Sequence, residues 1–222
     1  MLTAKIKEVF TSIQGEGPYI GVKQLFIRFC ECNLNCDYCD TDFVSQNVKD
    51  YTVQELAKMI NAEINLHSVA LTGGEPLLQV RFLKELLSLI NVPVYLETNA
   101  TLSENLAEII DEVDIVSADI KLVSSSGMNT FEQHKKFFET CFEKQKETFI
   151  KIVFDNKITD QEIVNSIGLA MKFDYEIILQ PKMIGNNFAC SQKEIEDIFE
   201  KFTLQYKKTR LIPQTHKFLG VR

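Results

Sequence analysis

The sequence contains no run approaching the roughly 18 apolar residues that a membrane-spanning helix requires. The strongly apolar segment FLKELLSLINVPVYL still carries the charged residues Lys84 and Glu85 near its start. The first ten residues, MLTAKIKEVF, also lack the long apolar stretch of a signal peptide. We therefore expect a cytoplasmic protein that has no membrane partner.

Basic residues are too few for a broad phosphate-binding surface. The chain has 24 Lys and Arg against 31 Asp and Glu, which gives a formal net charge of -7. Non-specific affinity for nucleic acid depends on clustered Lys and Arg. The composition therefore argues against a nucleic-acid partner and favours a small molecule.

A linker rich in Pro, Gly or Ser that would separate two domains is also missing. The most loop-like segment, residues 122–130, is too short to divide the chain. With 222 residues, 45% of them hydrophobic, the chain can bury a large core without cross-links. We expect a single domain over residues 1–222.

Short apolar runs alternate with amphipathic helical patterns, which is typical of βαβ units and a parallel sheet. Helical spacing is clearest in residues 52–64, 77–90 and 160–173. Six candidate strands lie at residues 24–29, 68–73, 92–98, 114–120, 148–154 and 176–181. Six units fit either a doubly wound sheet or an incomplete barrel, and both place their chemistry at the carboxyl ends of the strands.

Polar residues follow these strands where that rule predicts a site. TGGEP ends the second strand, ETN the third, ADIK the fourth and QP the sixth, while a cysteine cluster ends the first. Each group taken singly could be a helix cap or a turn. Because five of them meet at one edge of the predicted sheet, we interpret them as a binding site.

The cysteines are concentrated between residues 30 and 39. Cys32, Cys36 and Cys39 have the spacing C-x3-C-x2-C, and no second cysteine pair or histidine pair completes a usual structural zinc site. A zinc site would need Cys30 as its fourth ligand, whereas we otherwise expect Cys30 to be a buried thiol in apolar surroundings. A [4Fe-4S] cluster needs one thiolate per iron, so three cysteines would leave one iron open to a ligand.

The C-x3-C-x2-C spacing resembles that of the radical S-adenosylmethionine (SAM) superfamily, and TGGEP resembles its GGEP motif. This resemblance implies that Cys32, Cys36 and Cys39 hold a [4Fe-4S] cluster whose open iron binds SAM. It also implies that the GGEP residues contact the amino group of SAM. We expect the SAM contacts to be Gly73, Gly74 and Glu75, with Asn99, Ser117, Asp119 and Gln180 at later strand ends.

The segment SIQGEGPYIG, before the first strand, reads as a glycine-rich loop whose backbone groups can bind a planar polar ligand. On the strand that follows, the period of two places Arg28 on the same face as Cys30, toward the expected cluster. The planar guanidinium of an interior arginine suits a carboxylate ligand. A structural salt bridge to a nearby acid is the alternative.

Together, SIQGEGPYIG, FIRF, CNLNCDYCDTDF, TGGEP, LETN and PQTHKFLGVR closely resemble the 7-carboxy-7-deazaguanine synthase family from end to end of the chain. The resemblance implies conversion of 6-carboxy-5,6,7,8-tetrahydropterin to 7-carboxy-7-deazaguanine with loss of ammonia, toward queuosine and other 7-deazapurines. It further implies a modified, incomplete TIM-like barrel of about six βα units. A homodimer, Mg2+ and a flavodoxin or ferredoxin reductant are expected with it.

The same resemblance implies individual roles in the site. Thr41, directly after the last cysteine and Asp40, matches the Mg2+ ligand, and Mg2+ prefers such oxygen donors. We also expect Glu97 to accept or relay a proton. The expected substrate-binding residues are Gln14, Gly15, Glu16, Arg28, His216 and the terminal Arg222.

Two other functions stay open at this point. A glycyl-radical activating enzyme shares the cysteine loop but would act on a protein, whereas the QGEG loop, Arg28 and THKFLGVR favour a small acid. A zinc-stabilised binding module without catalysis is the alternative from a different class.

Overall fold

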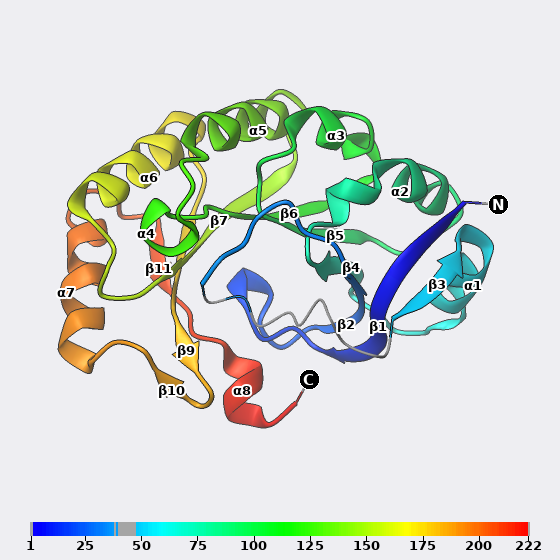
Figure 1. Ribbon diagram of the computed structural model, residues 1–222, viewed down its shortest axis with the longest axis horizontal. Helices are drawn as coiled ribbons and strands as arrows, with labels where there is room; N and C mark the ends of the chain where they lie inside the picture. Colours follow the sequence, from blue (N-terminus) through cyan, green and yellow to red (C-terminus); the bar gives the residue numbers. More distant parts are fainter. Residues whose placement is uncertain (1, 38, 40–47, 222) are drawn as a thin grey trace.

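The computed structural model describes residues 2–37, 39 and 48–221, and within them one curved sheet of nine strands carries most of the helices on its convex side (Figure 1). The strand order is β11-β8-β7-β6-β5-β4-β2-β1-β3. Neighbours from β2 to β11 all pair in parallel. The predicted incomplete barrel is confirmed.

All six predicted strands are present, within one or two residues of their expected ends. They are β2 (Lys23–Phe29), β4 (Ser68–Gly73), β5 (Val94–Thr98), β6 (Ile115–Asp119), β7 (Glu147–Phe154) and β8 (Ile177–Pro181). A further parallel strand, β11 (Thr209–Leu211), was not predicted, because three residues are too few to show a pattern.

The opposite edge of the sheet also holds strands that the sequence did not reveal. β1 (Thr3–Ile13) pairs antiparallel with β2, and β3 (Lys49–Thr52) pairs antiparallel with β1. The register of β1 shifts between Ile6 and Glu8, so its inward and outward positions exchange partway along the strand. That irregularity hides the alternation by which a strand is recognised.

The helices lie mainly between successive parallel strands, as βα units require. The predicted helix 160–173 coincides with α6, and the one at 77–90 is a 3-10 turn followed by a shorter helix. No helix in the described part of the chain is long and apolar enough to cross a bilayer. The α-helices are α1 (Val53–Ala62), α2 (Val80–Leu87), α3 (Ser103–Ala107), α4 (Val123–Ser126), α5 (Phe131–Glu143), α6 (Asp160–Phe173), α7 (Gln192–Thr203) and α8 (Thr215–Leu219).

Two short elements, a helix and a hairpin, lie on the open side of the sheet, away from α5 and α6 (Figure 1). There α8 lies near a two-stranded hairpin. The hairpin strands are β9 (Met183–Ile184) and β10 (Asn187–Phe188), and the 3-10 turns are η1 (Gly17–Tyr19), η2 (Pro76–Gln79) and η3 (Ile110–Glu112).

Alternate residues of the parallel strands face the concave side of the sheet in two layers. Apolar side chains toward the amino-terminal ends form an inner core of Phe26, Ala70, Tyr95, Ile115, Phe149 and Ile178. Two residues further along the same strands the side chains line a cavity, and they are Arg28, Thr72, Glu97, Ser117, Lys151 and Gln180. Because residues two apart share a face of a strand, this polar layer lies directly above the inner core.

Candidate active site

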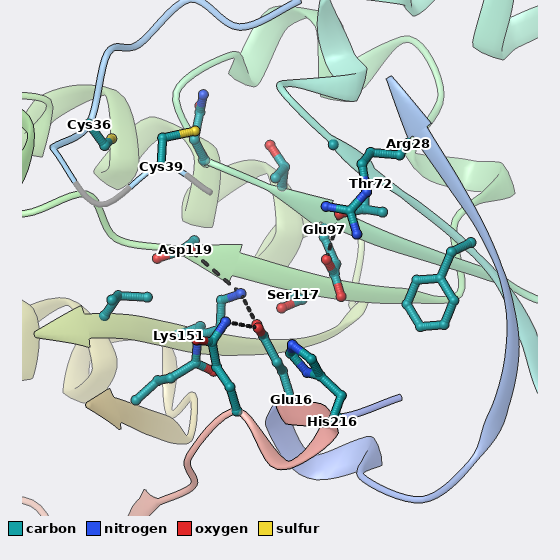
Figure 2. Close-up of a pocket in the computed structure, with 18 of the residues that line it drawn as sticks. Glu16, Arg28, Cys36, Cys39, Thr72, Glu97, Ser117, Asp119, Lys151 and His216 are labelled. Carbon is teal, nitrogen blue, oxygen red and sulfur yellow. Dashed lines mark hydrogen bonds and ion pairs between the residues drawn. The ribbon is translucent and has the colours of Figure 1, made fainter. Parts of the chain in front are cut away.

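A cavity of about 220 Å³ opens at the carboxyl ends of the parallel strands. It lies above the inner core and receives side chains from β1, from the parallel strands β2 and β4 to β8, from the loop before η1, and from α8 (Figure 2). This is the position at which barrels and doubly wound sheets carry their sites.

The structure brings most of the predicted site residues together around this cavity. Thr41 and Arg222 fall outside the described residues. Glu75 is described but does not line the cavity. The predicted residues that do line it are Gln14, Gly15, Glu16, Arg28, Cys32, Cys36, Cys39, Gly73, Gly74, Glu97, Asn99, Ser117, Asp119, Gln180 and His216.

Glu75 is completely buried behind the cavity wall. Its carboxylate accepts hydrogen bonds from the backbone N–H groups of Leu77 and Asn99 and from the Thr98 hydroxyl, at 2.7 to 3.0 Å. Burial raises the pKa of Glu75 to about 7, against the lowering effect of these donors. In this structure the carboxylate therefore fixes the end of β5 and does not line the cavity.

The cysteine loop is tied to the end of β5. The Asn99 side-chain amide donates to Asn33 Oδ1 at 2.8 Å, and the Asn33 amide donates to the Thr101 hydroxyl at 2.9 Å. The Asn99 amide nitrogen also lies 3.9 Å from Cys32 Sγ. Asn99 thus holds the start of the loop that carries the thiols, in addition to lining the cavity.

The donor set of the loop fits an iron-sulfur cluster better than a single ion. Cys32, Cys36 and Cys39 all line the cavity, whereas Cys30 is buried away from it. Among residues 2–37, 39 and 48–221, no three His, Cys, Asp or Glu side chains converge closely enough to hold one metal ion. A [4Fe-4S] cluster places its thiolates on separate irons, so it needs no such convergence.

Gly73 sets the distance between the end of β4 and the strand that leads into the cysteine loop. Its φ is +113°, and a Cβ atom here would lie 2.3 Å from the carbonyl oxygen of Phe29. The next residue, Gly74, donates its backbone N–H to that same oxygen at 2.9 Å. Only glycine permits this approach.

Two buried acceptors on the cavity wall have no hydrogen-bond partner among the described residues. They are Asp119 Oδ1 and Gln180 Oε1, on residues that are 7% and 2% exposed. Buried polar atoms are rarely left unpaired. Two such acceptors facing one cavity fit a ligand that carries N–H or O–H donors, as the ribose and adenine of SAM do.

Glu97 is held from two sides. Its Oε1 accepts a hydrogen bond from the Gln14 amide at 3.0 Å, and its Oε2 accepts one from the Thr72 hydroxyl at 2.7 Å. The Gln14 amide also donates to Gln24, which in turn donates to the Ser68 hydroxyl. Gln24 and Thr72 were missed in the sequence, although strand alternation places both on the inward face.

A buried ion network lies beside Glu97. Lys151 Nζ lies 2.7 Å from Glu16 Oε2 and 3.5 Å from Asp119 Oδ2 (Figure 2). Gln214 donates to the other oxygen of Glu16, and Lys121 donates to Asp119. Burial alone would raise the pKa of Glu16, but Lys151, the hydrogen bond from Gln214 and the nearby His216 lower it to about 2.

Arg28 faces the cavity, and it also has the acidic neighbour that the alternative interpretation requires. Its Nε lies 3.4 Å from Glu8 Oε2 without hydrogen-bond geometry, and its guanidinium lies 5.9 Å from the centre of the Phe10 ring. Nε has no hydrogen-bond partner in the described part of the chain. Nε itself is buried although the side chain is 28% exposed, and an unpaired N–H on a guanidinium suits an anionic ligand.

The first residues of α8 bind the glycine-rich loop directly. The backbone N–H of Thr215 donates to the carbonyl oxygen of Gly15 at 2.8 Å. A Cβ on Gly15 would lie 2.4 Å from His216 Nδ1, so the histidine packs against the bare backbone. His216 thereby lines the cavity beside Glu16.

His134, on α5, is a further buried group that the sequence did not single out. Its Nδ1 donates to the carbonyl oxygen of Ala100, and its Nε2 accepts from the backbone N–H of Lys121. The neutral ring therefore joins the loops after β5 and β6, which carry Asn99 and Lys121. Burial lowers the pKa of His134 to about 4.

Comparison with known proteins defines the class. Residues 26–170 match the model of the Radical SAM superfamily, so the chain is a member of that superfamily. Its fold is similar to that of QueE from Escherichia coli, with a TM-score of 0.66 and 19% identity over 96% of this chain and 95% of that one. It is also similar to Streptococcus suis SuiB bound to S-adenosylmethionine, with a TM-score of 0.56 and 15% identity over 85% and 46%.

The sequence comparison is more specific. The chain is 38% identical to the 7-carboxy-7-deazaguanine synthase of Archaeoglobus fulgidus, with 100% of both chains covered. It is 35% identical to that of Geobacter sulfurreducens, with 98% of this chain and 97% of the relative covered. The protein belongs to the 7-carboxy-7-deazaguanine synthase family.

It is therefore a radical SAM enzyme of 7-deazapurine biosynthesis, and superfamily membership implies a [4Fe-4S] cluster and SAM as cofactors. The comparisons do not favour a glycyl-radical activating enzyme or a zinc-stabilised binding module.

Replacing Gly73 by alanine should disrupt the cysteine loop. We expect Gly73→Ala to cost more than about 2 kcal/mol of unfolding free energy and to lower the iron bound after anaerobic reconstitution, because the new methyl group collides with Phe29. Gly127→Ala is the matched control, since Gly127 also has positive φ, +69°, but no atom within 4 Å of its Cβ position. Equal losses in the two variants would contradict this account.

His134 should contribute stability that is lost on mild acidification. Its folded-state pKa of about 4 lies below the ordinary value of 6.5, so the contribution is complete above pH 6.5 and is lost as the pH falls toward 4. The raised pKa of Glu75 gives stability the opposite pH dependence, so the contribution of His134 is measured as a difference between variants. Between pH 6.5 and 4, the unfolding free energy of the unaltered protein in urea should fall by up to about 3 kcal/mol relative to that of His134→Gln, whereas His67→Gln should follow the unaltered protein. A pH-independent difference between His134→Gln and the unaltered protein would exclude this origin.

Proposed function

We propose that the protein converts 6-carboxy-5,6,7,8-tetrahydropterin to 7-carboxy-7-deazaguanine with release of ammonia. The main support is that the three thiols of the cysteine loop and the glycine-rich loop with Glu16 open into the same cavity. SAM bound at an iron-sulfur cluster and a small polar acid can therefore lie next to each other in this cavity. The family to which the chain belongs carries the name of this product.

In this proposal Cys32, Cys36 and Cys39 hold the cluster. When bound, the cluster and SAM supply a carbon-centred radical that abstracts a hydrogen atom from the substrate. The cavity wall binds SAM through backbone groups at Gly73 and Gly74 and through the side chains of Asn99, Ser117, Asp119 and Gln180. Glu75 acts through Asn99, whose backbone it holds.

The substrate would lie between the glycine-rich loop, β2 and α8. Arg28 and His216 offer positive or hydrogen-bonding groups to its carboxylate, and Arg222 would close this side. Gln14 and Gly15 offer backbone groups to the pterin ring, and the Glu16 carboxylate accepts from N–H groups at its edge. Packing of His216 against Gly15 brings these two sets of contacts together.

Glu97 is the proposed proton acceptor or relay. Ring contraction and ammonia release both require a proton to move, and a carboxylate in the polar layer of the cavity can accept it. The hydrogen bonds from Gln14 and Thr72 hold both oxygens in fixed directions. This fixes where Glu97 can exchange a proton.

Further parts of the proposal rest on the family resemblance, except the single domain and the cytoplasmic location, which rest on composition and sequence pattern. Mg2+ would bind through Thr41 and the substrate carboxylate, where it orients the substrate and stabilises charge. The protein would act as a homodimer of single-domain chains. A flavodoxin or ferredoxin would supply the electron, and the reducing cytoplasm would be its location.

The direct test is product formation by the reconstituted enzyme. Anaerobically reconstituted and reduced protein, incubated with SAM, Mg2+ and 6-carboxytetrahydropterin, should release ammonia and 7-carboxy-7-deazaguanine. Omission of Mg2+ should lower the rate, because the substrate carboxylate loses its partner. A protein that acquires the visible absorbance of a [4Fe-4S] cluster and cleaves SAM, yet yields no deazapurine, would contradict the proposed substrate.

Replacing the Glu97 carboxylate by an amide should affect catalysis more than substrate binding. We expect Glu97→Gln to lower kcat by about 10² to 10⁴ and to change KM by less than about fivefold, since the amide keeps the shape but not the basicity. Glu85→Gln, at an exposed position on α2, is the matched control and should match the unaltered enzyme. Full activity of Glu97→Gln would remove this residue from the proposal.

A further inference from the structure

Lys151 has no role in the reaction as proposed above, yet it is one of the most buried charges in the described part of the chain. The residue is 7% exposed and lies in the middle of β7. Its side chain faces the cavity between the inward residues Phe149 and Val153, and β-sheet register pairs it with Asp119 on β6. An ammonium at such a position is stable only if carboxylates compensate its charge.

Two carboxylates from separate parts of the site provide that compensation. Glu16 Oε2, on the glycine-rich loop, lies 2.7 Å from Nζ, and Asp119 Oδ2 lies 3.5 Å from it. Figure 2 shows Lys151 between them. Each carboxylate has one further donor, Gln214 for Glu16 and Lys121 for Asp119.

Without Lys151 the surroundings of Glu16 would favour protonation. Burial disfavours the charged form, and the carboxylates of Asp119 and Glu97 add negative charge from β6 and β5. Against these effects, Gln214 donates one neutral hydrogen bond to Glu16. The other basic side chains among the described lining residues are Arg28 on β2, Lys121, Lys182, and His216 and Lys217 on α8. Within residues 2–37, 39 and 48–221, only Lys151 forms an ion pair with Glu16.

The protonation state of Glu16 decides which ligand edge it can bind. An ionised carboxylate only accepts hydrogen bonds, whereas the protonated form donates one. The edge of a pterin presents N–H donors from its 2-amino group and N3. A lumazine, with oxygen in place of the 2-amino group, presents an acceptor there, which an ionised carboxylate repels.

We propose that Lys151 is a specificity-determining positioning residue: it holds Glu16 in place as a pure hydrogen-bond acceptor, so that the cavity selects aminopyrimidinone rings over their dioxo analogues. The inference rests on the proposed function, because it takes the ring of a carboxypterin as the group beside Glu16. Lys151 acts through Glu16 and does not itself touch the substrate.

Binding of stable, oxidised probes tests the inference without turnover. The reconstituted holoenzyme with SAM and Mg2+ is titrated with 6-carboxypterin and with 6-carboxylumazine between about pH 5 and pH 8. The unaltered enzyme should prefer the pterin by about tenfold or more, with little dependence on pH beyond the titration of the probes. The matched control is Lys172→Met, which removes an exposed lysine from α6.

In Lys151→Met, Glu16 should become protonated at the lower pH values. Pterin affinity should then fall by about tenfold at the acidic end and recover as the pH rises, while the preference over the lumazine shrinks. The double variant Glu16→Gln/Lys151→Met should lose this pH dependence. Lys151→Arg, which keeps the charge, should restore the preference, an outcome that a merely structural role does not predict.

Several results would overturn the inference. A Lys151→Met enzyme with unchanged, pH-independent preference would do so, as would a double variant that keeps the pH slope. If Lys151→Met does not fold, Lys151→Gln is measured in its place, and Glu16→Gln with Lys151 intact must still lose the preference for the pterin. Failure of the unaltered holoenzyme to bind 6-carboxypterin would instead contradict the proposed function, and the inference with it.

Discussion

The two-residue period of side chains along parallel strands is the constraint on which the site depends. Each strand contributes an apolar side chain to the inner core and, one full period later, a polar one to the cavity, as in Tyr95 and Glu97 or Phe149 and Lys151. The inner core excludes water from below, so the charges above it interact strongly. A register slip of one residue on any strand would bury its polar group among helices instead.

Much of the fold could be predicted because parallel strands and their helices are local patterns. The cysteine spacing and the polar strand ends likewise follow one another closely in the sequence. Elements that depend on tertiary context were missed: β1 has an internal register shift, and β11 is too short to show alternation. The partners of Lys151 were invisible for a related reason, since Glu16 precedes it by 135 residues.

The GGEP motif indicated where the site lies, but it did not reveal which groups the Glu75 carboxylate binds. The GGEP sequence correctly marked the end of β4 as part of the cavity wall, where Gly73 and Gly74 lie. A carboxylate at the N-cap of a helical turn can also accept from the chain's own N–H groups, and in this structure Glu75 does so. Sequence could not decide between these uses, because the deciding donor, Asn99, comes from another strand.

The contact between Thr215 and Gly15 has a consequence for synthesis of the protein. Residues near the start of the chain form one wall of the cavity, but the segment that covers them is translated about 200 residues later. A nascent chain therefore cannot complete this wall of the cavity until α8 has been synthesised.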